Sequence, residues 1–138
     1  MRCVKVAVPA IILLFLVLAT VQRNAVWHTL LTMWTDCAAK SSQKSRTHNN
    51  LGNCYLLLGK HFPAIAEYQK AVGLDNTNMQ AQYNLATQLD NVGLSSLAAR
   101  HYEVFCRFAP PTFPEQKKAA CRRFQELNHE MSTESKRR

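Results

Sequence analysis

The chain has 138 residues, which allows one compact domain and excludes a two-domain enzyme. With 47% hydrophobic and 19% charged residues, its composition differs from that of a disordered protein. The formal net charge is +8, but residues 45–112 hold five cations against four anions, so the excess charge lies near the two ends. A nucleic-acid interface would place this charge on the folded surface, and we therefore expect no nucleic-acid partner.

The first predicted element is an apolar segment near the N-terminus. From Val6 to Val21, every residue except Pro9 and Thr20 is aliphatic or phenylalanine, and two cations precede the run. This pattern is typical of membrane insertion or export. As a helix the run reaches about 24 Å, against roughly 30 Å for the hydrocarbon core, so spanning is marginal. We predict that residues 1–23 are a single transmembrane anchor; a signal peptide that is cleaved on export is the alternative.

The second predicted element is a helix over residues 24–40. Trp27, Leu30, Leu31 and Trp34 follow the i, i+3, i+4, i+7 spacing of one helix face. Tryptophans beside an apolar segment also occur in membrane-interface belts. We expect Trp34 to pack under the elements that follow, whereas Trp27 fits either role.

The central part of the chain repeats with a period of 34 residues. Identical or similar residues align at this offset without a gap in the pairs Asn50/Asn84, Leu51/Leu85, Gly52/Ala86, Gly59/Gly93, Ala64/Ala98, Tyr68/Tyr102 and Leu74/Phe108. Within each unit the apolar residues recur at helical spacing, which predicts two helices. Gly59 and Gly93 fall where the first helix ends, a position that favours glycine. Each unit is therefore predicted to be a helical hairpin.

These units resemble the tetratricopeptide repeat (TPR), with repeats at 45–78 and 79–112. The matching positions are Leu51, Gly52, Tyr55, Ala64, Tyr68 and Ala71 in the first unit and Leu85, Ala86, Ala98, Tyr102 and Pro110 in the second. His48 and Gln82 depart from the usual early aromatic position, which changes packing without breaking a helix. The resemblance implies an all-α helical-hairpin solenoid, and we predict a TPR domain over residues 24–128.

Two hairpins alone would leave apolar faces uncovered at both ends of the stack. Continuing the repeat register backwards makes residues 24–40 the second helix of a degenerate earlier repeat. Residues 113–128 are predicted to be a capping helix, because Thr112 and Glu115 fit a capping box at its start. Residues 129–138 form a polar basic tail that we expect to be frayed.

The chain also resembles the C-terminal end of membrane TPR proteins of the transmembrane O-mannosyltransferase-like family. The apolar helix, the Arg-Asn-x-x-Trp segment at 23–27, Trp34 and the 48–52 segment carry this resemblance. It implies repeats on the non-cytoplasmic side; the cations before the apolar run favour this orientation, whereas those after it, from Arg23 to Arg46, favour the opposite one. That family's multi-helix membrane domain, with its acidic catalytic loop, is not part of this sequence. The resemblance thus implies a non-catalytic C-terminal fragment of a multi-spanning glycosyltransferase as an alternative function.

The histidines and cysteines show no spacing typical of metal ligands, since the sequence contains neither C-x-x-C nor H-x-x-x-H. There is no Gly-rich phosphate loop either. We therefore expect no enzyme activity, no metal and no cofactor. The cysteines outside the N-terminal segment fall within predicted helices, where we expect buried thiols, and no disulfide pairing follows from the sequence.

In the TPR family the first helix of each unit lines a concave groove, and this predicts where a peptide binds. The predicted peptide-binding residues are Asn49, Asn50, Asn53, Tyr83, Asn84 and Thr87. Amides suit a peptide backbone because each offers both donors and an acceptor. Asn50 and Asn84 precede the Leu-Gly and Leu-Ala pairs, where peptide-binding members carry an asparagine ladder; a solvated helix face is the alternative. We predict a membrane-tethered interaction module that holds a protein or peptide partner in this groove.

Overall fold

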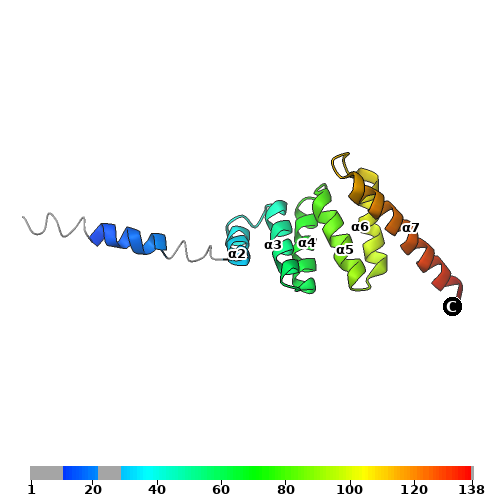
Figure 1. Ribbon diagram of the computed structural model, residues 1–138, viewed down its shortest axis with the longest axis horizontal. Coiled ribbons are helices and arrows are strands. Elements are labelled where there is room, and N and C mark those ends of the chain that lie inside the picture. The colour runs from blue at the N-terminus through cyan, green and yellow to red at the C-terminus, as the bar shows by residue number, and fades with distance from the viewer. Residues whose placement is uncertain (1–10, 22–28, 138) are drawn as a thin grey trace, which may run out of the picture.

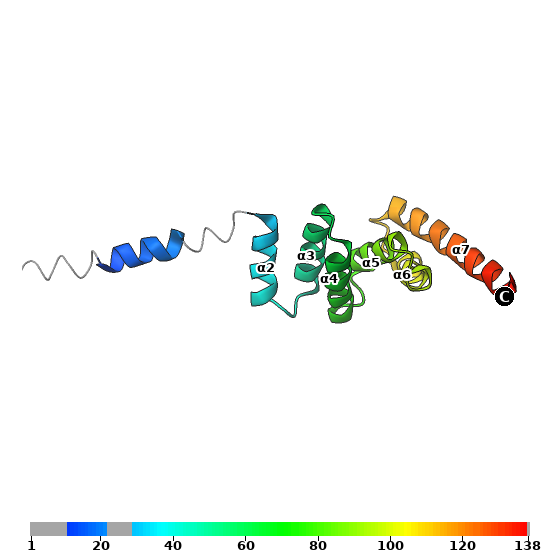
Figure 2. The ribbon, with the colours of Figure 1, turned by 90° about the horizontal axis from the view of Figure 1, so that it is seen from below.

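The computed structural model of the protein describes residues 11–21 and 29–137, and every regular element within these ranges is a helix. After the helix at 11–21, the helices are α2 (Leu30–Lys40), α3 (Ser45–Leu57), α4 (His61–Leu74), α5 (Met79–Asn91), α6 (Ser95–Phe108) and α7 (Pro114–Arg137). From α2 onwards each helix packs against the next one in the chain. Figures 1 and 2 show the resulting elongated stack. The predicted all-α helical-repeat architecture is confirmed.

The helical hairpins α3–α4 and α5–α6 turn at glycines, as the repeat pattern predicts. Gly59 and Gly93 have positive φ angles of 69° and 79°, a conformation in which a side chain would be strained. In the first hairpin Gly59 N–H donates to Leu56 O, and Lys60 N–H donates to Tyr55 O, both at 2.9 Å. These two bonds form a Schellman motif, which satisfies carbonyls at the end of α3. The second turn has the equivalent pair of bonds.

The hairpins close on small residues packed against tyrosines. Ala64 and Ala98 are fully buried, and the Tyr68 and Tyr102 side chains beside them are also buried. The Tyr68 ring lies against Gly52, and a Cβ atom built on this glycine would be 2.5 Å from the ring. The repeat positions thus let the two helices of a hairpin approach closely.

The departure from the TPR pattern at His48 creates a buried polar link within the first hairpin. His48 Nδ1 lies 2.7 Å from Glu67 Oε2 on α4, and its Nε2 lies 2.9 Å from the Ser42 carbonyl oxygen. Burial raises the pKa of the Glu67 carboxyl, but hydrogen bonds from Lys70 and His48 outweigh burial and hold that pKa below its ordinary value. The link therefore connects α3 both to α4 and to the turn that precedes α3.

The second hairpin has an equivalent link, but there the histidine lies on the second helix of the hairpin rather than on the first. Gln82 and His101 stand 34 residues after His48 and Glu67, and His101 Nδ1 donates to Gln82 Oε1 at 2.8 Å. Gln82 Nε2 donates in turn to the Asn76 carbonyl oxygen at 3.0 Å. In each unit a polar pair thus links the two helices at the position where the TPR pattern has an aromatic residue, and both helices are intact.

At the N-terminal side, α2 packs on α3 as a half-repeat. The helix begins at Leu30, because Thr29 caps it and forms a capping box with Thr32. Trp34 is half-buried, as expected of a residue under the first repeat, whereas Leu30 is 61% exposed and does not point inward. Trp27 and the rest of 24–28 lie outside the described residues.

Helix α7 covers the other end of the stack and runs on to Arg137, past the boundary predicted at residue 128. Its Ala120 and Leu127 side chains are fully buried, and Met131, beyond that boundary, still packs against the core. This continued packing explains why the tail is helical rather than frayed. A disulfide between Cys106 and Cys121, whose Cα atoms are 5.1 Å apart, links α6 to α7.

The membrane prediction is wrong on this structure. Residues 11–21 form a helix in which the large apolar side chains are 50–69% exposed, but its length is only roughly 17 Å, about half of the hydrocarbon core. Across the described ranges, no helix is both long and apolar enough to cross a membrane. The predicted single-pass localisation, with the TPR domain on the non-cytoplasmic side, is therefore corrected. Residues 1–10 and 22–23 of the predicted anchor lie outside the description.

Candidate functional site

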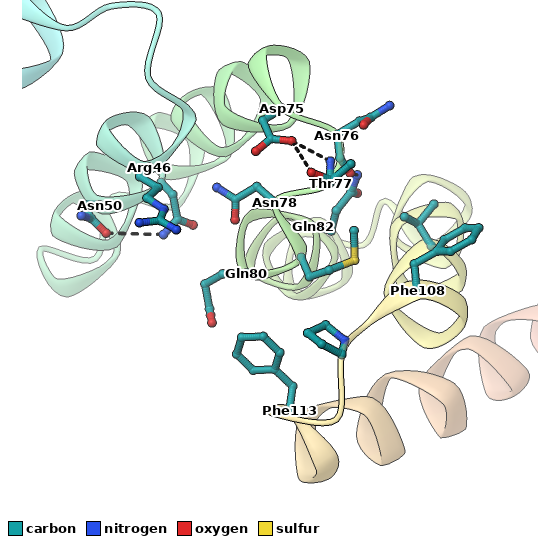
Figure 3. Close-up of a pocket in the computed structure, with 14 residues that line it drawn as sticks. Arg46, Asn50, Asp75, Asn76, Thr77, Asn78, Gln80, Gln82, Phe108 and Phe113 are labelled. Atoms are coloured by element: carbon teal, nitrogen blue, oxygen red, sulfur yellow. Dashed lines mark hydrogen bonds between the residues drawn. The ribbon is translucent and has the colours of Figure 1, made fainter.

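A cavity of about 1040 Å³ is lined by the first turns of α3 and α5, the end of α6 and the loops before α5 and α7. Its polar lining consists of Arg46, Asn49, Asn50, Asp75, Asn76, Thr77, Asn78, Gln80 and Gln82. Its apolar lining consists of Met79, Val104, Phe108, Pro110 and Phe113. In Figure 3, Arg46 and Asn50 lie on one side of the cavity and Phe108 on the opposite side.

Local hydrogen bonds fix the loop that forms one edge of the cavity. The Thr77 N–H and hydroxyl both donate to Asp75 Oδ1, at 2.9 and 2.6 Å. These bonds, more than the nearby Arg46, lower the pKa of the Asp75 carboxyl. Asn78 caps α5 by accepting from Ala81 N–H at 3.1 Å. The edge of the cavity is thus held in place before any ligand arrives.

Asn84 uses most of its hydrogen-bonding capacity to join α5 to α3. Its Nδ2 donates to Asn49 Oδ1 at 3.0 Å and to Asn53 Oδ1 at 3.2 Å. Its Oδ1 accepts from Gln80 Nε2 at 3.2 Å. Asn53 Oδ1 also accepts from the Tyr68 hydroxyl at 2.7 Å. Asn84, which is predicted to form a ladder on the ligand with Asn50, therefore connects the two repeats to each other.

Several polar groups at the cavity make no hydrogen bond to the described residues, among them groups of Asn50, Gln80 and Arg46. Asn50 accepts a long bond of 3.5 Å from Asn49, but no acceptor lies near its own Nδ2 group. Gln80 donates to Asn84, which leaves its Oε1 without a donor. The exposed Arg46 guanidinium makes neither a hydrogen bond nor an ion pair within the part of the chain described. The cavity thus presents donor groups on Asn50 and Arg46 and an acceptor on Gln80 to a ligand, and the side-chain amide of Asn76 beside them is likewise unpaired within the described residues.

Only part of the predicted peptide-binding set lines this cavity. Asn49 and Asn50 do, whereas Asn53, Tyr83, Asn84 and Thr87 do not. The Tyr83 ring packs against Phe105, with centroids 5.0 Å apart. The Thr87 hydroxyl donates to the Tyr83 carbonyl oxygen at 3.0 Å. Peptide binding by the four residues away from the cavity stays a prediction.

The apolar lining was not predicted as part of a site. Phe108 aligns with Leu74 in the repeat, which indicates a packing position, yet its side chain is 63% exposed at the cavity. Pro110 and Phe113 belong to the loop that leads into α7. The only signal in the sequence is that these large apolar residues cluster in and around a proline-rich loop, and that signal does not indicate which surface they face.

No protein-family model and no curated protein matches the chain. Solved structures do match, including the Yersinia enterocolitica type III secretion translocator chaperone SycD, with a TM-score of 0.67, 16% identity, and 85% of this chain and 81% of that chain covered. SycD in complex with a peptide of the translocator YopD matches with a TM-score of 0.67, 16% identity, and 84% and 89% coverage. At this identity the likeness establishes the helical-repeat fold. It does not support the O-mannosyltransferase-like family.

Proposed function

We propose that the chain is a non-catalytic helical-repeat module that holds an extended segment of a partner protein in the cavity between α3, α5 and α6. The observation that carries this proposal is the set of unpaired polar groups on Asn50, Gln80 and Arg46. Every peptide unit offers one N–H and one C=O, which need an acceptor and a donor in return. Gln80 Oε1 provides the acceptor, and Asn50 Nδ2 or Arg46 provides the donor.

The size of the cavity and its prior order also support this function. Its volume of about 1040 Å³ slightly exceeds the range of roughly 300–1000 Å³ usual for small-molecule sites, so several residues of an extended chain fit. Because Asn78 and Asp75 already fix the edge, binding does not have to order it, which favours affinity. The structural neighbour SycD, which binds a peptide of YopD, further supports a peptide ligand.

The test begins with a library of short random peptides displayed on phage and selected on the full chain. A selected peptide is then synthesised and its Kd measured by fluorescence anisotropy. We expect the double variant Asn50→Ala/Gln80→Ala to bind about 30-fold more weakly, since two hydrogen bonds at about 1 kcal/mol each are lost.

The matched control is Asn91→Ala/Gln125→Ala, which removes two exposed amides, at the end of α5 and on α7, that do not line the cavity. This variant should bind like the wild type. Selection of no peptide at all would refute the proposal, and so would equal affinity of wild type and Asn50→Ala/Gln80→Ala. Far-ultraviolet circular dichroism confirms that both variants are folded.

A further inference from the structure

Large apolar side chains on one side of the cavity are exposed to solvent, although such side chains are usually buried. Phe108, in the last turn of α6, is 63% exposed, and Val104 lies one turn before it. Met79, Pro110 and Phe113 complete this apolar wall. A concave cluster of large apolar side chains with a polar rim is more typical of a binding site than of the rest of a protein surface.

The apolar wall is held in shape by contacts behind it. The Cys106–Cys121 disulfide closes the chain on both sides of the loop that carries Pro110 and Phe113. The Phe113 ring packs on the buried Phe105, with centroids 6.0 Å apart. The wall is therefore preformed, which reduces the ordering that a ligand side chain must impose.

The charges at the cavity limit the chemistry of a ligand. Arg46 is the cation and Asp75 the carboxylate of the lining. Thr77 binds only Oδ1 of Asp75, so this carboxylate keeps its charge and opposes that of Arg46, and the lining could not neutralise a run of acidic residues. Complementarity thus favours a segment that is uncharged where it meets the wall.

We infer that the cavity selects segments by one bulky apolar side chain, such as leucine, methionine or phenylalanine, which enters the wall formed by Met79, Val104, Phe108, Pro110 and Phe113. The backbone beside this side chain pairs with Asn50 and Gln80. This inference rests on the proposed function and adds the residue class that determines specificity.

The same phage selection tests the inference through the sequences that it enriches. We expect the selected peptides to share one large apolar position without flanking acidic residues. A synthetic peptide from this set should lose affinity about 10-fold to 100-fold when that position is changed to alanine, because its apolar surface returns to water. In the protein, Phe108→Asp should produce a loss of the same order.

The matched control for Phe108→Asp is Phe62→Asp. Phe62 is 73% exposed and does not line the cavity, so this variant should bind like the wild type. Because both phenylalanines are mostly exposed, we expect both variants to fold, and their helical content and thermal midpoints verify it.

Several results would overturn the inference. Enriched peptides that lack an apolar position, but whose binding still falls in Asn50→Ala/Gln80→Ala, would leave the proposed function intact and refute the apolar specificity. Unchanged affinity of Phe108→Asp would do the same. A wild-type dimer in sedimentation experiments that Phe108→Asp converts to a monomer would show that a second copy occupies the wall. Selection of no peptide would instead contradict the proposed function itself.

Discussion

Replacing Gly52 by alanine should place a methyl group too close to the Tyr68 ring. A Cβ atom at Gly52 would lie 2.5 Å from Cε1, 2.7 Å from Cδ1 and 3.0 Å from Cζ of that ring. Tyr68 has no room to move aside, since its side chain is fully buried and its hydroxyl donates to Asn53 at 2.7 Å. The same burial raises the pKa of Tyr68 to about 12. We therefore expect the substitution to force α3 and α4 apart.

The expected magnitude follows from two opposing effects. Overpacking a well-packed core typically destabilises by about 1–3 kcal/mol. Alanine is favoured over glycine within a helix by about 1 kcal/mol, which offsets part of the loss. The net decrease in the free energy of unfolding for Gly52→Ala is thus about 0–2 kcal/mol.

Gly73→Ala provides the matched control, because Gly73 also lies in a helix but a Cβ atom there would meet nothing within 4 Å. This variant should gain up to about 1 kcal/mol from helix propensity alone. The difference between the two variants, about 1–3 kcal/mol, therefore measures the packing effect. Urea unfolding followed by circular dichroism gives both values. If Gly52→Ala were as stable as Gly73→Ala, the close approach of α3 and α4 at Tyr68 would be refuted.

Three further predictions concern α7, the disulfide and pH. Cys106→Ser/Cys121→Ser should lower the free energy of unfolding by about 3 kcal/mol, the value for a loop of this length, and reductant should destabilise the wild type but not this variant in thermal unfolding. Arg123 donates to both Asp90 carboxylate oxygens, at 2.7 and 3.0 Å, so Arg123→Ala should cost about 1.5–3 kcal/mol, and unchanged hydrogen exchange in α7 would argue against this role. Burial, together with the charge of the neighbouring Arg100, lowers the pKa of His101 below 6.5. As pH falls, the imidazole is therefore protonated at a higher pH in the unfolded chain than in the folded chain. The stabilisation by neutral His101 is complete above pH 6.5 and is lost as pH falls through the folded-state pKa. In urea unfolding at a series of pH values, the free energy of unfolding should therefore fall less with acid in His101→Gln than in the wild type.

The repeat and its turns could be predicted because they depend on local sequence. The 34-residue period aligns Gly59 with Gly93, and a glycine at the end of a helix has a local conformational cause. Both hairpins follow from these positions. The helical end of α7 could not be predicted, because polar residues beyond Leu127 are held by the packing of Met131, a contact between distant parts of the chain.

The candidate site could be predicted only on its polar side. Asn49 and Asn50 lie on the first helix of a hairpin, and the repeat register places them at the cavity. Phe108 and Phe113 reach the same cavity from the end of α6 and the following loop, and their direction depends on how that loop folds back. The pairing of Cys106 with Cys121 likewise depends on the distance between two packed helices, which spacing in the sequence does not give.

The polar pairs of the two hairpins bear on how each hairpin keeps its own helices during folding. Because the repeats are so similar, α3 could in principle close on α6, and α5 on α4. The first mispairing would bury His48 against His101, which sets two imidazoles together and removes the carboxylate that His48 meets in its own hairpin. Such a contact replaces the bond between His48 and a carboxylate, which is the stronger kind, by a bond between two rings. Because the histidine lies on the first helix of one hairpin and on the second helix of the other, each helix pairs best with its own partner. This arrangement disfavours swapping of helices within one chain or between two chains.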